Sequence, residues 1–145
     1  MKKIRGEKFK MNGESQKFEA LCNQILEVLL WSLIEDDEGT KLTHRELSIR
    51  LDQEVLAVNT PRYLEAIGYF CDRHNIPILP VLVVNEKTKF PGAWFNRLYQ
   101  QFYKNSGVNV EALYANELDR IYQFGYWDKI ASDLKLDAQL TMRLL

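Results

Sequence analysis

The stretch that most constrains the fold is residues 76–95, IPILPVLVVNEKTKFPGAWF. Two prolines lead into the apolar run 81–84, the polar segment 85–89 interrupts it, and Pro91 and Gly92 close the unit. The run is too short to cross a membrane and is rich in β-branched residues, so it predicts a buried strand. The polar residues after it are typical of a turn or an irregular hairpin. We expect the partner of this strand within about the next 15 residues, or on the N-terminal side of the second helix of the chain.

Three helices are predicted before this strand. Ser15 caps a segment whose apolar residues recur every three or four positions, which predicts an amphipathic helix of about five turns. Thr43 and Glu46 form a capping box that begins a short helix of about two turns. Thr60 is the predicted cap of a third helix, with Pro61 at its first position.

Three further helices follow the strand, over about 94–103, 109–122 and 127–134, and Asn109 is the predicted cap of the second. Helices followed by a strand and a hairpin predict an α+β, mostly helical, winged-helix-like domain with additional C-terminal helices. We divide the chain into a basic flexible arm at 1–14, a single domain at 15–136 and a C-terminal tail at 137–145.

Composition limits what the chain does. The 145 residues suffice for one domain with a core of its own, and the formal net charge of -1 gives no overall attraction to nucleic acid. Cys22 and Cys71 lie inside apolar helical patterns, which favours reduced, buried thiols. The sequence contains neither a signal peptide pattern nor an apolar stretch long enough to span a membrane, so we expect a cytoplasmic protein.

Signatures of catalysis are weak. His44 and His74 have no zinc-ligand spacing with the cysteines, and no nucleotide-binding glycine pattern occurs. We therefore predict no cofactor, no metal site and no enzymatic activity. One catalytic hypothesis remains, in which Cys71 or His44 reacts, but apolar neighbours such as Ile67 and Phe70 favour a buried structural thiol.

The sequence resembles a family of small bacterial proteins, many of them from mobile elements. This resemblance implies no particular chemical activity. The segments that carry the resemblance are 43–47 (THREL), 69–71 (YFC), 76–85, Pro91-Gly92 and 121–128. They extend over roughly residues 21–130.

A more distant resemblance is to the winged-helix domain of DNA alkyltransferases and alkyltransferase-like proteins. The tripeptide 83–85 (VVN) matches the end of their active-site motif, and Arg62 lies near their arginine finger. Pro80 stands where the reactive cysteine or tryptophan belongs, and 81–82 replaces His-Arg. Without a thiolate, methyl transfer to cysteine is excluded at this site, so the resemblance implies architecture rather than activity.

Two functional hypotheses remain open. A winged helix would present a moderately positive face, and the candidate nucleic-acid-binding residues are Arg45, Arg50, Arg62, Lys87 and Lys89. Nearby carboxylates offset these cations, which favours an ordinary balanced surface. The first hypothesis is a bacterial or phage module that binds nucleic acid, in a regulatory role. The alternative is a protein-interaction module of a mobile element that inhibits or modulates a host defence protein, through part of an aromatic surplus in the C-terminal half of the chain. This surplus consists of Trp94, Phe95, Tyr99, Phe102, Tyr103, Tyr114, Tyr122, Phe124, Tyr126 and Trp127.

Overall fold

The computed structural model describes residues 15–35, 41–103 and 109–145. The predicted basic arm at 1–14 lies outside these residues. The elements are α1 (Gln16–Glu35), β1 (Leu42–Thr43), α2 (His44–Arg50), the 3-10 turn η2 (Ala57–Asn59), α3 (Thr60–Arg73), the 3-10 turn η3 (Leu79–Leu82), β2 (Val83–Val84), α4 (Ala93–Tyr103), α5 (Val110–Gln123), α6 (Trp127–Asp133) and α7 (Ala138–Leu144). The mostly helical α+β class predicted from the sequence is confirmed.

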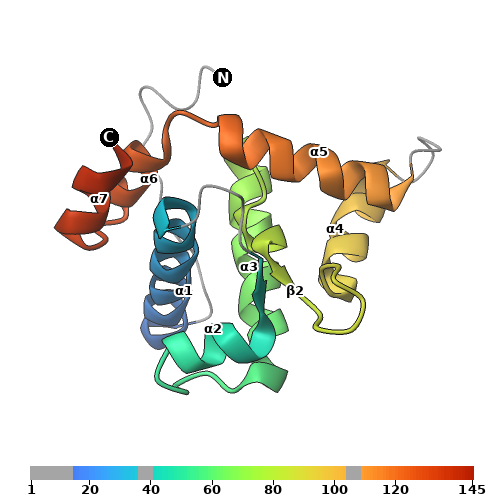
Figure 1. Ribbon diagram of the computed structural model, residues 1–145, viewed down its shortest axis with the longest axis horizontal. Helices are drawn as coiled ribbons and strands as arrows, with labels where there is room; N and C mark the ends of the chain where they lie inside the picture. The colour runs from blue at the N-terminus through green and yellow to red at the C-terminus, as the bar shows by residue number, and fades with distance from the viewer. Residues whose placement is uncertain (1–14, 36–40, 104–108) are drawn as a thin grey trace.

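The helices surround α3, which packs against α1 and α4 (Figure 1). Helix α5 lies across one end of the molecule, and α2 lies at the opposite end (Figure 1). Helices α6 and α7 pack against each other, and α7 also contacts α1.

One apolar core joins these helices. Periodicity predicts that seven residues are buried together, and all seven belong to the core, with exposed fractions between 0% and 7%: Leu21, Ile25, Leu29, Leu47, Leu64, Ile67 and Val83. Cys22 and Cys71 are fully buried in the same core, as the apolar patterns around them predict.

The predicted strand over 81–84 is only half correct. Residues Leu79–Leu82 form the 3-10 turn η3, and only Val83–Val84 is a strand. Pro80 lies in the first turn of η3, where the fixed φ of proline suits a helical turn and its missing N–H breaks no bond. The whole run is nevertheless buried, so the apolar pattern correctly predicts the location of the run but not its backbone conformation.

Strand β2 pairs with β1, in parallel, with Leu42 opposite Val83 and Thr43 opposite Val84. Its partner therefore lies on the N-terminal side of the second helix, and not in a hairpin after β2. In the described part of the chain this two-stranded sheet is the only one.

Local capping explains where several helices begin. The Ser15 hydroxyl accepts from the Phe18 N–H at 3.1 Å, and Thr43 and Glu46 form the predicted capping box at the start of α2. The prediction for Thr60 is wrong, because its hydroxyl donates backward to the Ala57 carbonyl at 2.8 Å. Helix α3 therefore begins without a hydrogen bond from a capping side chain.

The C-terminal residues, expected as a tail, contain helix α7. The Asp137 side chain accepts from two backbone N–H groups of its first turn. Leu140 is fully buried against the rest of the core. Helix α7 is therefore stabilised by its N-cap and by the burial of an apolar side chain, and it is part of the domain.

Candidate functional site

The parallel strand pair places two cation-bearing segments at one edge of the molecule. Helix α2 begins directly after Thr43, and the loop 85–90 begins directly after Val84, its partner in the register. Parallel neighbours run side by side about 4.8 Å apart, so the segments that come after them in the chain emerge at the same edge. Figure 1 shows α2 and the loop after β2 in the same half of the molecule, away from α5.

The loop itself is closed by hydrogen bonds to both ends of Asn85. The Asn85 N–H donates to the Phe90 carbonyl at 2.9 Å, and the Lys89 N–H donates to the Asn85 carbonyl at 2.8 Å. The Asn85 side chain accepts from the Lys87 and Thr88 N–H groups at 2.8 and 3.2 Å. Lys89 has a φ of 58°, in the left-handed region. This bonding fixes the loop and leaves the side chains of 85–89 exposed, while Phe90 packs against the core.

Three of the five candidate residues gather at this edge. Arg45 is exposed in the first turn of α2, and Lys87 and Lys89 are exposed on the loop. We call the surface formed by Arg45, Lys87 and Lys89 the cationic edge. The nearby Glu46 carboxylate is held by the backbone and hydroxyl of Thr43 in the capping box, and Glu86 is exposed on the loop.

The other two candidates lie elsewhere and are engaged within the protein. Arg50, at the far end of α2, is 3.7 Å from the Glu35 carboxylate of α1. The Arg62 guanidinium lies 5.0 Å from the ring centre of Phe18 and 5.9 Å from that of Tyr63. These contacts hold both arginines against the α1 side.

The α2 end also exposes apolar side chains. Ile49 is 54% exposed, Leu56 55% and Val58 80%. The Ser48 hydroxyl donates to the Val55 carbonyl at 2.7 Å, which ties the end of α2 to the segment that leads into η2. This apolar cluster of Ile49, Leu56 and Val58 was not singled out from the sequence, because Ile49 and Val58 follow no amphipathic pattern that marks them as exposed.

Aromatic residues, in contrast, are mostly internal. Trp94, Phe95, Tyr114 and Trp127 are buried, and they contact one another or Phe90 and Phe124 edge to face. Tyr122 and Tyr126, with 45% and 36% exposed, are the members of the aromatic surplus that reach the surface among the described residues.

Cys71 and His44, the two residues of the catalytic hypothesis, lie in surroundings that suit a structural role. Burial raises the pKa of Cys71 to about 12, so its thiol stays protonated and unreactive at neutral pH. His44 Nδ1 lies 2.7 Å from the Thr60 hydroxyl, which itself donates to Ala57. His44 therefore donates from Nδ1, and burial lowers its pKa. The imidazole links the start of α2 to the start of α3.

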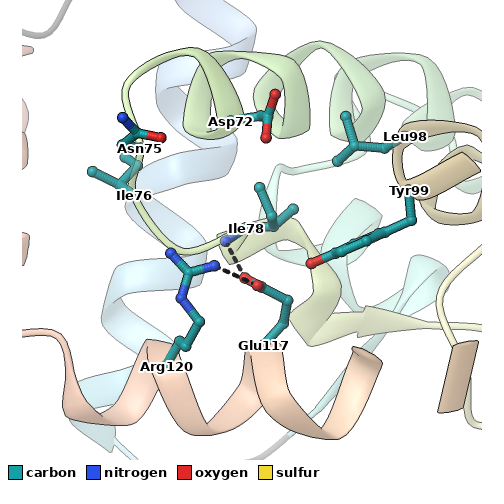
Figure 2. A pocket seen from close by; sticks show the side chains of 8 residues that line it. All are labelled: Asp72, Asn75, Ile76, Ile78, Leu98, Tyr99, Glu117 and Arg120. Atoms are coloured by element: carbon teal, nitrogen blue, oxygen red, sulfur yellow. Dashed lines mark hydrogen bonds and ion pairs between the residues drawn. The ribbon is translucent and has the colours of Figure 1, made fainter. Parts of the chain in front are cut away.

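A second, polar site lies between α3, α4 and α5 (Figure 2). It is a cavity of about 120 Å³ whose lining is Asp72, Asn75, Ile76, Ile78, Leu98, Tyr99, Glu117 and Arg120. A water needs roughly 10–15 Å³ by this measure, so the cavity has room for several water-sized groups. Figure 2 shows the Tyr99 hydroxyl directed toward Ile78 and Glu117.

Glu117 forms the floor of this cavity and is only 3% exposed. One carboxylate oxygen accepts from the Ile78 N–H at 2.9 Å, and the other accepts from the Arg120 guanidinium. Glu117 was not predicted as a site residue from the sequence. The available signal was its helical spacing with Tyr114 and Ile121, which are the other two buried residues of α5. Of the apolar residues that the spacing places on this helix, Ile121 is buried, Leu113 and Leu118 are partly buried against the core, and Tyr122 is 45% exposed.

Asp72 faces the same cavity from α3. Its pKa is raised by burial and by the negative charge of Glu117, while Arg120 opposes the shift. Within the described residues, no hydrogen bond or ion pair to the Asp72 carboxylate is present. The cavity therefore holds two carboxylates and one guanidinium, a formal excess of one negative charge.

Within 15–35, 41–103 and 109–145, no group of three or more His, Cys, Asp and Glu side chains is arranged to hold a metal ion. No helix in these ranges combines the length and the apolar character that crossing a membrane requires. No protein-family model, curated protein or solved structure matches the chain. Inferences about function therefore rest on the geometry of the cationic edge and of the cavity.

Proposed function

We propose that this protein is a non-enzymatic, winged-helix-like module that binds nucleic acid through the cationic edge, in a regulatory role in the cytoplasm of a bacterium or on behalf of a phage. The observation that carries the proposal is the parallel register of β1 and β2. It places Arg45 and the loop with Lys87 and Lys89 at one edge, although they are about 40 residues apart in the sequence.

Charge and exposure support phosphate contacts at this edge. All three side chains are exposed, and they are not among the residues that form ion pairs within the described chain. Lys and Arg that neutralise phosphates release counterions, so affinity falls with salt by a slope of about 0.9 for each phosphate neutralised on duplex DNA. Three contacts predict a slope of roughly −2.7 in a plot of log affinity against log salt.

In this proposal, α2 takes the role of the element that lies against the nucleic acid, and the loop 85–90 takes the role of the wing. The resemblance to the winged-helix domain of DNA alkyltransferases supports only the role of the loop, because it implies groove contact by the helix that carries Arg62, which is α3. Arg62 contacts rings of α1 and α3, so we assign it a secondary part, at the margin of the interface.

The test is a titration of labelled duplex and single-stranded DNA at two salt concentrations. The wild type should bind with a steep salt dependence, and Lys87→Gln with Lys89→Asn should flatten the slope by about two units on every sequence. Asparagine is chosen because it tolerates the left-handed backbone of Lys89.

A matched control exists in Lys135, which is exposed and has a φ of 59°. Lys135→Asn removes the same charge from the same backbone conformation between α6 and α7, and should leave the slope unchanged. Salt-independent binding, or equal loss in Lys89→Asn and Lys135→Asn, would rule out the cationic edge as the interface.

The second candidate function is binding of a host protein, and the apolar cluster at Ile49, Leu56 and Val58 favours it. Single exposed apolar residues are ordinary, but three on neighbouring segments are a feature of protein interfaces. Recovery of partners from host lysate with and without nuclease separates the two functions. One protein that is retained after nuclease treatment by the wild type and lost with Val58→Glu supports protein binding.

A further inference from the structure

We propose that the cavity between α3, α4 and α5 is a binding site for a primary ammonium group, carried by a small amine or by a lysine side chain. This site is independent of the cationic edge. It is a preformed hollow of about 120 Å³, lined by side chains from three helices and by the segment that leads into η3.

The charge of the lining selects a cation. Arg120 is already matched by Glu117, so an anion would find no cation left to pair with. Asp72 contributes a further negative charge, and its carboxylate has no partner among the residues that the structure describes. An ammonium group would pair with Asp72 and supply the donors that this carboxylate and the remaining lone pairs of Glu117 can accept.

The shape of the lining selects a short apolar stem behind the ammonium group. Ile76, Ile78 and Leu98 form the apolar part of the wall, and the Tyr99 ring adds to it (Figure 2). A stem of a few methylenes buries against such a wall while its charged head meets the carboxylates. A metal ion fits less well, because Asp72 and Glu117 are the only carboxylates of the lining.

Glu117 also explains why the cavity is preformed. A buried carboxylate is expensive unless its hydrogen bonds are made, and Glu117 accepts from the Ile78 N–H and the Arg120 guanidinium. These bonds fix the segment before η3 against α5. Asp72, in contrast, makes no such contact with the described residues, and its raised pKa means that folding disfavours its charge. A carboxylate that faces a cavity and has no hydrogen-bond or ion-pair partner among the described residues is a candidate for binding a cation.

The experiment is a titration of the protein with n-butylammonium, followed by two-dimensional NMR. The Ile78 amide reports directly, since it donates to Glu117. We expect saturable shifts with n-butylammonium and none with n-butanol, at constant ionic strength. A second arm with Nα-acetyl-lysine amide distinguishes the sources: binding of both probes assigns a lysine side chain, and binding of butylammonium alone assigns a free amine.

Asp72→Asn should weaken binding by about tenfold, a loss of roughly 1.4 kcal/mol. The matched control is Asp119→Asn, which removes the same charge from an exposed position on α5 and should change affinity by less than about twofold. Asp72→Ser repeats the test if the asparagine variant loses its dispersed spectrum. Absence of shifts with both amines, equal shifts with butanol, or unchanged affinity in the Asp72 variants would overturn the proposal.

Discussion

Gly68 of α3 lies so close to the indole of Trp94 on α4 that a Cβ at Gly68 would be 2.9 Å from Cζ3 of the ring. Trp94 is 1% exposed and packs edge to face with Phe95, so the ring is enclosed on its other sides. The glycine thus sets the distance between α3 and α4, and through it the width of the polar cavity that both helices line.

Gly68→Ala should therefore destabilise the protein, although alanine is the better helix former by about 1 kcal/mol. Overpacking costs about 1–3 kcal/mol, so we expect a net loss in the free energy of unfolding, measured by denaturant melts. Gly125→Ala is the control, because a Cβ there meets nothing within 4 Å. A neutral or stabilising Gly68→Ala would show that the indole moves freely.

Leu29→Ala should lower the free energy of unfolding by about 2–5 kcal/mol, because Leu29 is fully buried in the core on α1. Gln24→Ala, at an exposed position of the same helix, should change it by less than about 0.5 kcal/mol. Equal effects of the two substitutions in urea melts would place the Leu29 side chain outside the core.

The stability of the protein should fall as the pH drops below the ordinary histidine pKa of 6.5, in part because of His44. Burial lowers the pKa of His44 in the folded state, so the unfolded chain takes up the proton first. The loss begins near 6.5 and is complete below the folded-state pKa.

His44→Asn keeps an N–H donor for the Thr60 hydroxyl and cannot titrate, so it should flatten the stability profile across this window. Thermal melts of both proteins at a series of pH values give the comparison, and His74 is present in both. Parallel profiles for the two proteins would contradict a role for His44.

Neither cysteine should react with a thiol reagent while the protein is folded. Burial raises the pKa of both Cys22 and Cys71 to about 12, and both side chains are fully buried. Ellman's reagent at pH 8 should detect no thiol in the native protein and two after unfolding in guanidinium. The doubly substituted Cys22→Ala, Cys71→Ala protein should still bind DNA once its lower stability is allowed for. Loss of binding in a folded double variant would revive the thiol hypothesis.

Sequence reasoning succeeded where the signal is local. The capping box of Thr43 and Glu46 and the caps at Ser15 and Asn109 involve residues two or three positions apart, so the pattern contains all the information. Core positions were likewise predictable from periodicity, because one helix face decides them. The five candidate cations were expected on one positive face; Arg45, Lys87 and Lys89 are exposed at the same edge, and their binding role remains a prediction.

It failed where the decisive partner is distant. Of the two places expected for the strand partner of Val83, the N-terminal side of the second helix is the correct one, but nothing near Val83 indicates that Leu42 pairs with it in parallel. The nearby prolines turned half of the apolar run into a 3-10 turn. Glu117 was missed for the same reason: a carboxylate is expected outside, and the Ile78 N–H that donates to it is 39 positions away. Arg62 was predicted to bind nucleic acid. Its contact with the Phe18 ring could not be predicted from the sequence, because it depends on how α3 packs against α1.

The parallel pair of β1 and β2 also has a consequence for the growing polypeptide. Helix α2 is complete, with Arg45 in place, long before β2 has been synthesised, yet the register that positions the loop beside it needs Val83 and Val84. A nascent chain that has emerged from the ribosome only as far as Pro80 contains every residue of α2. It still lacks the strand β2 and both lysines of the cationic edge. We expect the nascent protein to acquire this surface late and in one step, when the loop emerges and the ladder closes.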